Sequence, residues 1–197
     1  MERNLTAISL IAATAAVGAA CSKMEPKAPA PSPVERGSYL ATVGGCHDCH
    51  TPKVFTAAGP QPDATRLLSG HPADALLPAV PPGVITPDGW GPLTNGHLSA
   101  WAGPWGISFA ANLTPDATGL GAWTEEVFIQ AMRTGKHAGV GRPILPPMPW
   151  FNYAKMTDDD LKAVFAFLKS LPPISNTVPA PVPPPAPVAM PPRPTAG

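Results

Sequence analysis

Several features that mark common protein classes are scarce in this sequence. The formal net charge is +0, so charge gives no support to nucleic acid or a strongly acidic protein as the partner. No internal repeat is found, and no grouping of an acid, a base and a nucleophile is visible. The segments around the cysteines also lack the alternating pattern that predicts strands. Nucleic-acid binding and acid–base or nucleophilic catalysis are therefore poor explanations of the chain.

Proline and glycine, in contrast, are abundant, with 30 and 18 copies in a chain of 197 residues. This length has room for one domain plus extensions. The combined excess of proline and glycine indicates low-complexity segments around a smaller folded core.

Cysteine is scarce again, with 3 copies, two of which lie in Cys46-His47-Asp48-Cys49-His50. Cys-x-x-Cys-His is typical of a c-type haem attachment site, in which both thiols bond to the haem and the histidine coordinates its iron. A zinc site would need a second pair of ligands, and a thioredoxin-like pair would need alternating strands and helices. The motif therefore predicts one covalent haem c, with Cys46 and Cys49 as attachments and His50 as an axial ligand.

The second axial ligand decides between carrier and catalyst, since a strong ligand favours electron transfer and an open position allows oxygen or peroxide chemistry. Met148 is the best candidate, because prolines on both sides stiffen its loop and a thioether suits haem iron. Met132 is better explained as a core residue of a helix. The histidines of the later loops are better explained as solvated residues: His71, His97 and His137.

The N-terminal residues predict export. Residues 1–20 combine a short charged start, an apolar run from Leu5 to Val17 and small residues before Cys21, as in a signal peptide. The run is too short for a transmembrane helix. Small residues followed by cysteine resemble the cleavage site of bacterial lipoproteins, so we expect lipidation at Cys21 and a membrane-anchored protein of the periplasm. The alternative is soluble export with cleavage near the same place.

The chain divides into a signal peptide (1–20), a lipidated Pro-rich linker (21–34), a folded domain (35–173) and a disordered Pro-rich tail (174–197). Apolar spacing predicts three helices in the domain. The first runs from Glu35 to Gly45 into the haem motif, with Tyr39, Leu40 and Val43 on its apolar face, and is stopped by Thr51-Pro52. The second is capped by Thr124 and ended by Gly135, and the third runs from Thr157 to Pro172 with a capping-box-like start.

Residues 53–111 show no sustained period and predict a long loop region with one short helix near residues 73–77. Aromatic residues in this region either wrap the haem or seal a small loop cluster, and both roles stay open: Trp90, Trp101, Trp105 and Phe109.

Several stretches together carry a family resemblance. They are Cys46-His47-Asp48-Cys49-His50, Asn112-Leu113-Thr114-Pro115-Asp116, Gly119 to Trp123, Arg133-Thr134-Gly135, Pro147-Met148-Pro149 and the helix from Thr157 to Pro172. In combination they resemble class I bacterial cytochromes c. The likeness is greatest to the single-haem domains in the cytochrome subunits of periplasmic alcohol and gluconate dehydrogenases, and it covers about residues 35–173.

This resemblance implies an all-α fold with long loops, in which the helix before the haem motif crosses the final helix with the haem between them. It implies His50 and Met148 as axial ligands of the iron. It also implies possible contacts of the haem propionates with Asn112, Thr114 and Arg133, although turn formation explains Asn112 and Thr114 equally well. Those subunits carry several haems, whereas this chain has one motif, so it is either a stand-alone shuttle or the partner of a separate enzyme.

The expected function is electron transfer by one low-spin haem c, with redox proteins such as a dehydrogenase or a terminal oxidase or reductase as partners. Catalysis by the chain itself is not expected. Two alternatives remain. One is a haem enzyme of the peroxidase or nitrite-reductase type, in which His137 or Arg142 takes the place of Met148. The other is a gas sensor in which Met148 is exchangeable and the tail reports to a partner.

Overall fold

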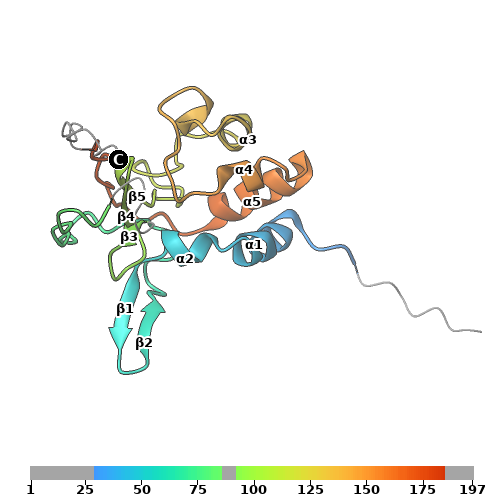
Figure 1. Ribbon diagram of the computed structural model, residues 1–197. Helices are drawn as coiled ribbons and strands as arrows, with labels where there is room; N and C mark the ends of the chain where they lie inside the picture. The colour runs from blue at the N-terminus through green and yellow to red at the C-terminus, as the bar shows by residue number, and fades with distance from the viewer. Residues whose placement is uncertain (1–28, 86–91, 185–197) are drawn as a thin grey trace, which may run out of the picture. The chain divides into compact units, whose positions relative to one another are not determined.

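The computed structural model describes residues 29–85 and 92–184 (Figure 1). The predicted signal peptide, Cys21, most of the linker, Trp90 and the end of the tail lie outside these residues. The chain divides into two units, Met1–Ala30 and Pro31–Gly197, and every element named here belongs to the second. No helix within the two described ranges is long and apolar enough to cross a membrane.

One helix of this unit is the haem motif itself, and the others lie before and after it in sequence. The helices are α1 (Pro33–Val43), α2 (Cys46–His50), α3 (Glu125–Thr134), α4 (Trp150–Tyr153) and α5 (Asp158–Ser170), with one 3-10 turn, η1 (His137–Gly139). The predicted second and third helices are confirmed. Thr124 accepts a hydrogen bond from the backbone of Val127 at the start of α3, and Gly135 ends that helix with φ 65°. Thr157 caps α5 in the same way.

The prediction of an all-α fold is wrong, because the region between α2 and α3 contains two antiparallel sheets. In the first, β1 (Lys53–Thr56) pairs with β2 (Gly59–Pro62), and this hairpin projects away from the helices (Figure 1). In the second, β3 (Leu93–Thr94), β4 (Ala100–Gly103) and β5 (Gly106–Phe109) lie in that order. The short helix predicted near residues 73–77 does not form either.

There is a physical reason why the sequence pattern did not predict these strands. Each has only two to four residues, which is too short to establish a period. Both hairpins have two-residue loops, Ala57-Ala58 and Pro104-Trp105, and neither loop carries the Asn-Gly or Asp-Gly signal that marks such turns. The sheets therefore depend on tertiary contacts that the local sequence does not reveal.

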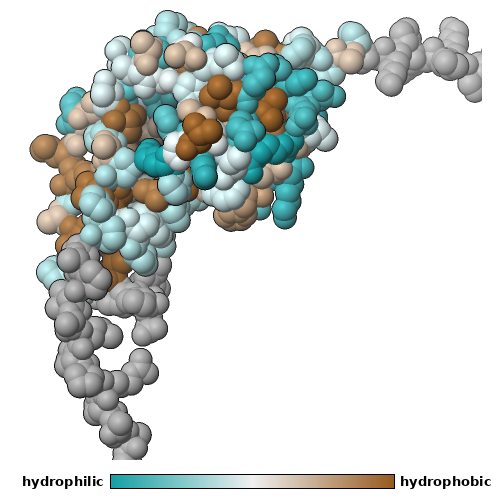
Figure 2. Space-filling model, turned by 90° about the horizontal axis from the view of Figure 1, so that it is seen from above, coloured by the Kyte–Doolittle hydropathy of each residue, from teal (hydrophilic) through white to brown (hydrophobic). Residues whose placement is uncertain are grey.

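The core lies between α3, α5 and the loops that face them. Its buried side chains are Leu68, Leu120, Phe128, Leu161, Val164, Phe165 and Leu168. Cys46 of the haem motif packs against this cluster, so α2 lies at the edge of the core. On the face seen in Figure 2, apolar residues form separate groups among hydrophilic ones.

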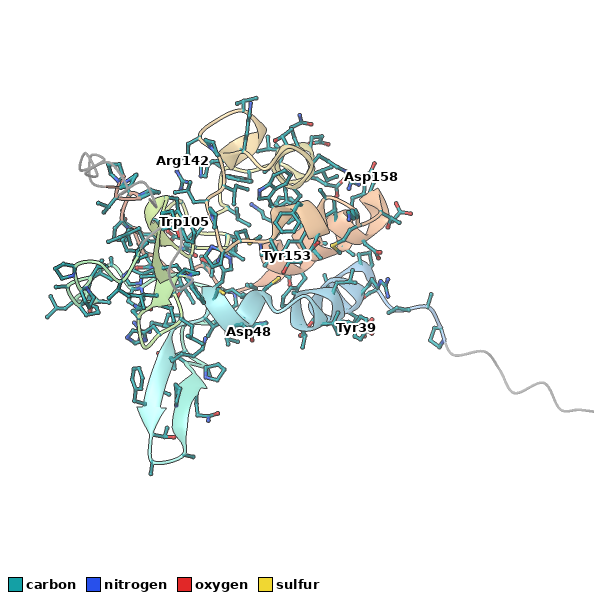
Figure 3. All side chains as sticks on the ribbon, in the orientation of Figure 1. Tyr39, Asp48, Trp105, Arg142, Tyr153 and Asp158 are labelled. Carbon is teal, nitrogen blue, oxygen red and sulfur yellow. The ribbon has the colours of Figure 1, made fainter. Side chains whose placement is uncertain are left out.

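Helix α1 crosses α5 at very short range, and this crossing explains which side of α1 is buried. A Cβ atom added to Gly37 would lie 1.9 Å from the carbonyl oxygen of Ala163. The buried residues of α1 are accordingly the small Gly37 and Ala41. Of the predicted apolar face, Tyr39, which is labelled in Figure 3, is 59% exposed, and Val43 is 63% exposed. That part of the prediction is wrong, because close helix packing selects small residues.

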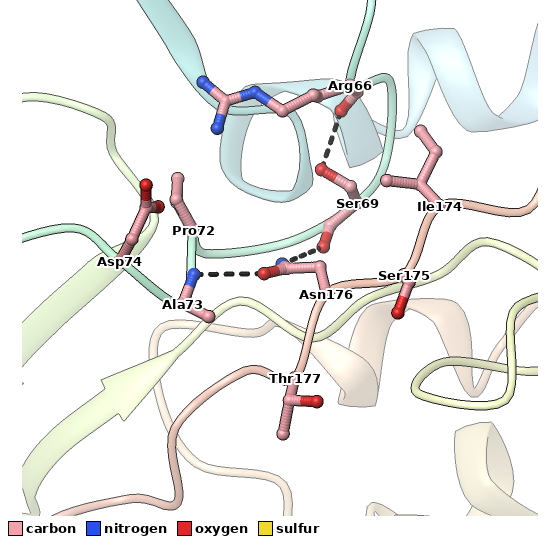
Figure 4. Close-up of a pocket in the computed structure, with 9 residues that line it drawn as sticks. All are labelled: Arg66, Ser69, Pro72, Ala73, Asp74, Ile174, Ser175, Asn176 and Thr177. Carbon is pink, nitrogen blue, oxygen red and sulfur yellow. Dashed lines mark hydrogen bonds between the residues drawn. The ribbon is translucent and has the colours of Figure 1, made fainter.

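The first part of the tail is attached to the domain. The backbone N–H of Ile174 donates to Thr114 Oγ1 at 3.1 Å. The Asn176 side chain donates to the backbone of Ser69 and accepts from that of Ala73 (Figure 4). It also donates to the backbone of His71, and it lines an open pocket of about 430 Å³. Further on, Val182 exchanges backbone hydrogen bonds with Ile107 of β5. Residues 174–182 thus run as an extended strap instead of a free tail.

Candidate haem site

The haem motif forms a short helix of its own. Gly44 and Gly45 separate α1 from α2, so the single helix predicted to run into the motif is in fact two. Gly45 has φ 70°, a left-handed conformation that glycine adopts at little cost. Thr51 ends α2 in an extended conformation, as Thr51-Pro52 was predicted to do. Cys46, Cys49 and His50 are therefore presented by one helical turn.

The His50 side chain is held by a backbone group from a distant part of the chain. Its side chain is buried, and Nδ1 lies 2.8 Å from the carbonyl oxygen of Ala111. A carbonyl can only accept, so Nδ1 carries the proton and Nε2 is the nitrogen available to a metal. Burial also lowers the pKa of His50, which favours the neutral ring that a metal ligand requires.

The backbone around His50 is fixed by a second contact. Gly70 donates its N–H to the carbonyl oxygen of His50 at 2.7 Å. Gly70 has φ 83°, and a Cβ there would lie 2.6 Å from the carbonyl oxygen of Ala110. Only glycine fits this position. We call α2 together with residues 68–71 and 110–114 the proximal frame.

Both cysteines of the motif carry free, half-buried thiols. Burial raises the pKa of Cys46 to about 11 and also raises that of Cys49. A reactive Cys-x-x-Cys pair in an oxidoreductase needs the opposite, a lowered pKa and a thiolate. The environment of Cys46 and Cys49 therefore argues against thiol–disulfide exchange.

Met148 lies half-buried in a loop that is anchored at both ends. Before it, the carbonyl oxygen of Pro146 accepts a hydrogen bond from Ser108 of β5 at 2.5 Å. After it, Tyr153 of α4, which is labelled in Figure 3, donates its hydroxyl to the carbonyl oxygen of Gly44. We call residues 146–149 the distal loop. The Tyr153 bond brings the helix that follows this loop against the start of the haem motif.

The residues predicted to meet the haem propionates make other contacts. Asn112 and Thr114 are buried and bond to each other, and both also bond to the backbone of Ile174. These bonds are those of a structural turn. Arg133 donates to the carbonyl of Ala154 and pairs with Asp158. Contact of these residues with haem propionates stays a prediction.

The histidines outside the motif occupy different environments. His71 is only 1% exposed, and its Nδ1 lies 2.9 Å from Ser99 Oγ, so describing it as solvated is wrong. His97 is half-buried, and its Nδ1 accepts from the backbone N–H of Lys53. His137 is exposed, as predicted. His71 was misjudged because the element that covers it, the Ser99–Ala110 region, is itself part of the unpredicted sheet.

Sequence reasoning missed three residues that support the site: Lys53, Ser108 and Tyr153. Ser108 and Tyr153 contact residues 38 and 109 positions away, and no local signal marks such pairs. Lys53 was detectable in principle, because a basic residue just after a helix can bond its last carbonyl groups.

The residues present fit a haem c. Two neutral thiols and an imidazole with a free Nε2 share one turn of helix, and a thioether lies in a loop tied to the start of that turn through α4. A family model described as Cytochrome c matches residues 34–172.

Several curated proteins are similar to this chain. A nicotinate dehydrogenase subunit of Pseudomonas putida is 30% identical over 148 residues, which are 75% of this chain and 9% of that protein. The gluconate 2-dehydrogenase cytochrome c subunit of Pantoea cypripedii is 30% identical over 135 residues, 68% of this chain and 22% of that protein. The fructose dehydrogenase cytochrome subunit of Gluconobacter japonicus is 28% identical over 136 residues, 68% of this chain and 20% of that protein. The chain thus spans less than a quarter of the length of each of these relatives. Because the family model matches most of this chain, the chain belongs to the cytochrome c family.

Proposed function

We propose that the protein is a periplasmic electron carrier with one covalently attached haem c. In this proposal Cys46 and Cys49 form the thioether bonds, and His50 and Met148 are the axial ligands of the iron. The observation that carries it is the bond from His50 Nδ1 to the carbonyl oxygen of Ala111 at 2.8 Å. This bond leaves Nε2 free to bind a metal, on the helix that also presents both thiols.

A bound haem would supply the one-electron chemistry, and His/Met ligation gives it a raised reduction potential. The protein's own residues hold and shield it. His50 is fixed by two contacts with backbone groups, and the stiff distal loop limits the motion of Met148. Such preorganised ligands need little rearrangement when an electron arrives or leaves. No side chain is required to move a proton.

The partner that best fits this role is a periplasmic dehydrogenase, because the similar proteins are named as dehydrogenase subunits. A lipid on Cys21 would keep the carrier at the membrane, with the Pro-rich linker as a spacer. Asn112, Thr114 and Arg133 remain the candidates for contact with the haem propionates.

The ligation is tested by the visible and near-infrared spectra of the holo-protein with Met148→Leu and, as a matched control, Met132→Leu. Met132 packs against the core, so its replacement by another apolar residue tests the effect of losing a methionine away from the distal loop. We expect a methionine-to-iron charge-transfer band in the wild type and in Met132→Leu, and its loss in Met148→Leu. A wild-type spectrum that is already high-spin, or unchanged by Met148→Leu, would contradict the proposal.

A further inference from the structure

Lys53 is a buried lysine whose side chain turns back onto the haem-binding helix. The residue is only 7% exposed. Its Nζ donates to the carbonyl oxygens of His47 at 3.2 Å, Asp48 at 2.9 Å and Thr51 at 2.5 Å. Buried lysines are rare unless they are paired, so this placement needs an explanation.

The geometry requires the charged form of the side chain. The three acceptors are backbone carbonyl groups, which donate nothing in return. An ammonium group has three N–H donors and satisfies all three, whereas a neutral amine has only two. None of the ion pairs formed by the described residues includes Lys53. Its positive charge is thus held by carbonyl dipoles and is not neutralised by a bonded carboxylate.

Helix α2 explains why such a group is useful. The last carbonyl groups of a helix have no partner within it and carry the negative end of the helix dipole. In α2, with 5 residues, most carbonyl groups are in this position, although the His47 carbonyl also accepts the N–H of Thr51 at 3.3 Å. Lys53 caps the C-terminal end of α2, where His50 is the last residue.

The surrounding strands fix Lys53 in place. Its backbone N–H donates to His97 Nδ1 at 3.2 Å, and in the β1–β2 hairpin Lys53 pairs with Pro62. Asp63, which follows Pro62, donates its N–H to the carbonyl oxygen of Pro52 at 2.8 Å. The projecting hairpin therefore anchors the residue that caps the haem helix.

We propose that Lys53 is a positioning residue of the haem site, which keeps His50 in register by capping α2 and raises the reduction potential with its buried positive charge. This inference rests on the proposed function, because it requires a haem iron on His50. A fixed positive charge near the iron disfavours the more positive oxidised state. Removal of the charge therefore lowers the potential.

The test is a spectroelectrochemical titration of the holo-proteins at pH 7 with Lys53→Met, Lys53→Gln and Lys53→Arg. Lys155→Met is the matched control, because it removes a lysine at an exposed position. We expect the equilibrium constant for reduction to fall about tenfold in Lys53→Met and Lys53→Gln, which is about 59 mV for a one-electron couple. Lys53→Arg, which keeps the charge, should stay within about twofold of the wild type, and so should Lys155→Met, whose charge is screened by water and salt.

A second readout separates positioning from general stability. The yield of covalently attached haem and the spin state should worsen in Lys53→Met and recover in Lys53→Arg. Equal potentials in the wild type, Lys53→Met and Lys53→Gln would overturn the inference, as would a fall of the same size in Lys155→Met. If Lys53→Met yields no holo-protein, the Gln and Arg variants decide, and equal potentials in those two overturn the electrostatic role.

The outcome is independent of the test of Met148. A wild-type protein with a low-spin His/Met spectrum and a potential insensitive to Lys53 would leave the proposed function standing and overturn only this inference. A high-spin wild-type spectrum would overturn the proposed function before Lys53 is considered.

Discussion

The two sides of the candidate haem site are built differently. The proximal frame holds His50 through backbone groups, namely the carbonyl of Ala111 and the N–H of Gly70. The distal loop holds Met148 through the stiffness of its prolines, the side chain of Ser108 and the hydroxyl of Tyr153. A frame made of backbone contacts tolerates few changes, whereas side-chain contacts can be removed one at a time. Mutations on the proximal side should therefore lower the stability of the protein. Mutations on the distal side should instead allow other ligands to replace Met148.

The largest effect is expected on the proximal side, from Gly70→Ala. The new Cβ would meet the backbone of Ala110 and Ala111, so we expect a loss of at least about 2 kcal/mol in the free energy of unfolding, measured by denaturant titration of the holo-protein. Gly59→Ala is the control, since Gly59 also has positive φ but nothing lies within 4 Å of its added Cβ. Equal losses in both variants would mean that the positive φ alone is responsible. The close approach of the new Cβ to the backbone of Ala110 and Ala111 would then cost nothing.

Acid should next weaken the turn at Asp63, which leads from the β1–β2 hairpin into the proximal frame. Hydrogen bonds from Thr65 and Arg66 lower the pKa of Asp63 to about 2 from 3.8. A carboxyl with a lowered pKa stabilises the fold above its unfolded pKa, and this contribution disappears as the pH falls from about 4 to about 2. In Asp63→Asn we expect the free energy of unfolding at pH 6 to drop by about 2 kcal/mol and its decline over this acid range to become shallower. An unchanged acid slope would show that other carboxyl groups control it.

On the distal side, Ser108→Ala should have a smaller effect on stability and a distinct effect on ligation. It removes the bond to Pro146 and should cost about 1 kcal/mol. Because that bond anchors the distal loop, the reduced protein should also bind carbon monoxide faster. Ser69→Ala is the control, since it removes a buried serine bond to Arg66 in the proximal frame. If both serine variants bind carbon monoxide at the same rate, Ser108 does not control Met148.

Tyr153→Phe should produce the smallest change of the four. It removes the hydroxyl that joins α4 to Gly44, at a cost of about 1 kcal/mol or less. Tyr39→Phe is the matched control, because Tyr39 is exposed and none of the hydrogen bonds among the described residues uses its hydroxyl. Thermal unfolding of the two holo-proteins should show a lower midpoint for Tyr153→Phe alone, and coincident curves would contradict the link between the two sides.

The sequence predicted those parts of the molecule whose signals are local. Thr124 and Gly135 mark the ends of α3, Thr157 marks the start of α5, and Cys-x-x-Cys-His is complete within five residues. The strands, the α1–α5 crossing at Gly37 and the attachment of Ile174 to Thr114 depend on residues far apart in the chain. The same holds for Ser108, whose partner Pro146 lies in a different element, so periodicity and capping rules could not find it.

In our proposal, Met148 closes the distal side of a haem that is attached at Cys46 and Cys49 and ligated by His50. The most direct test exposes the reduced wild-type holo-protein and Met148→Leu to carbon monoxide and follows the visible spectrum with time. We expect the wild-type spectrum to stay low-spin and unchanged over the time in which Met148→Leu binds carbon monoxide completely. Equally rapid binding by both proteins would contradict it, and would favour a haem enzyme or a gas sensor with an open or exchangeable distal position.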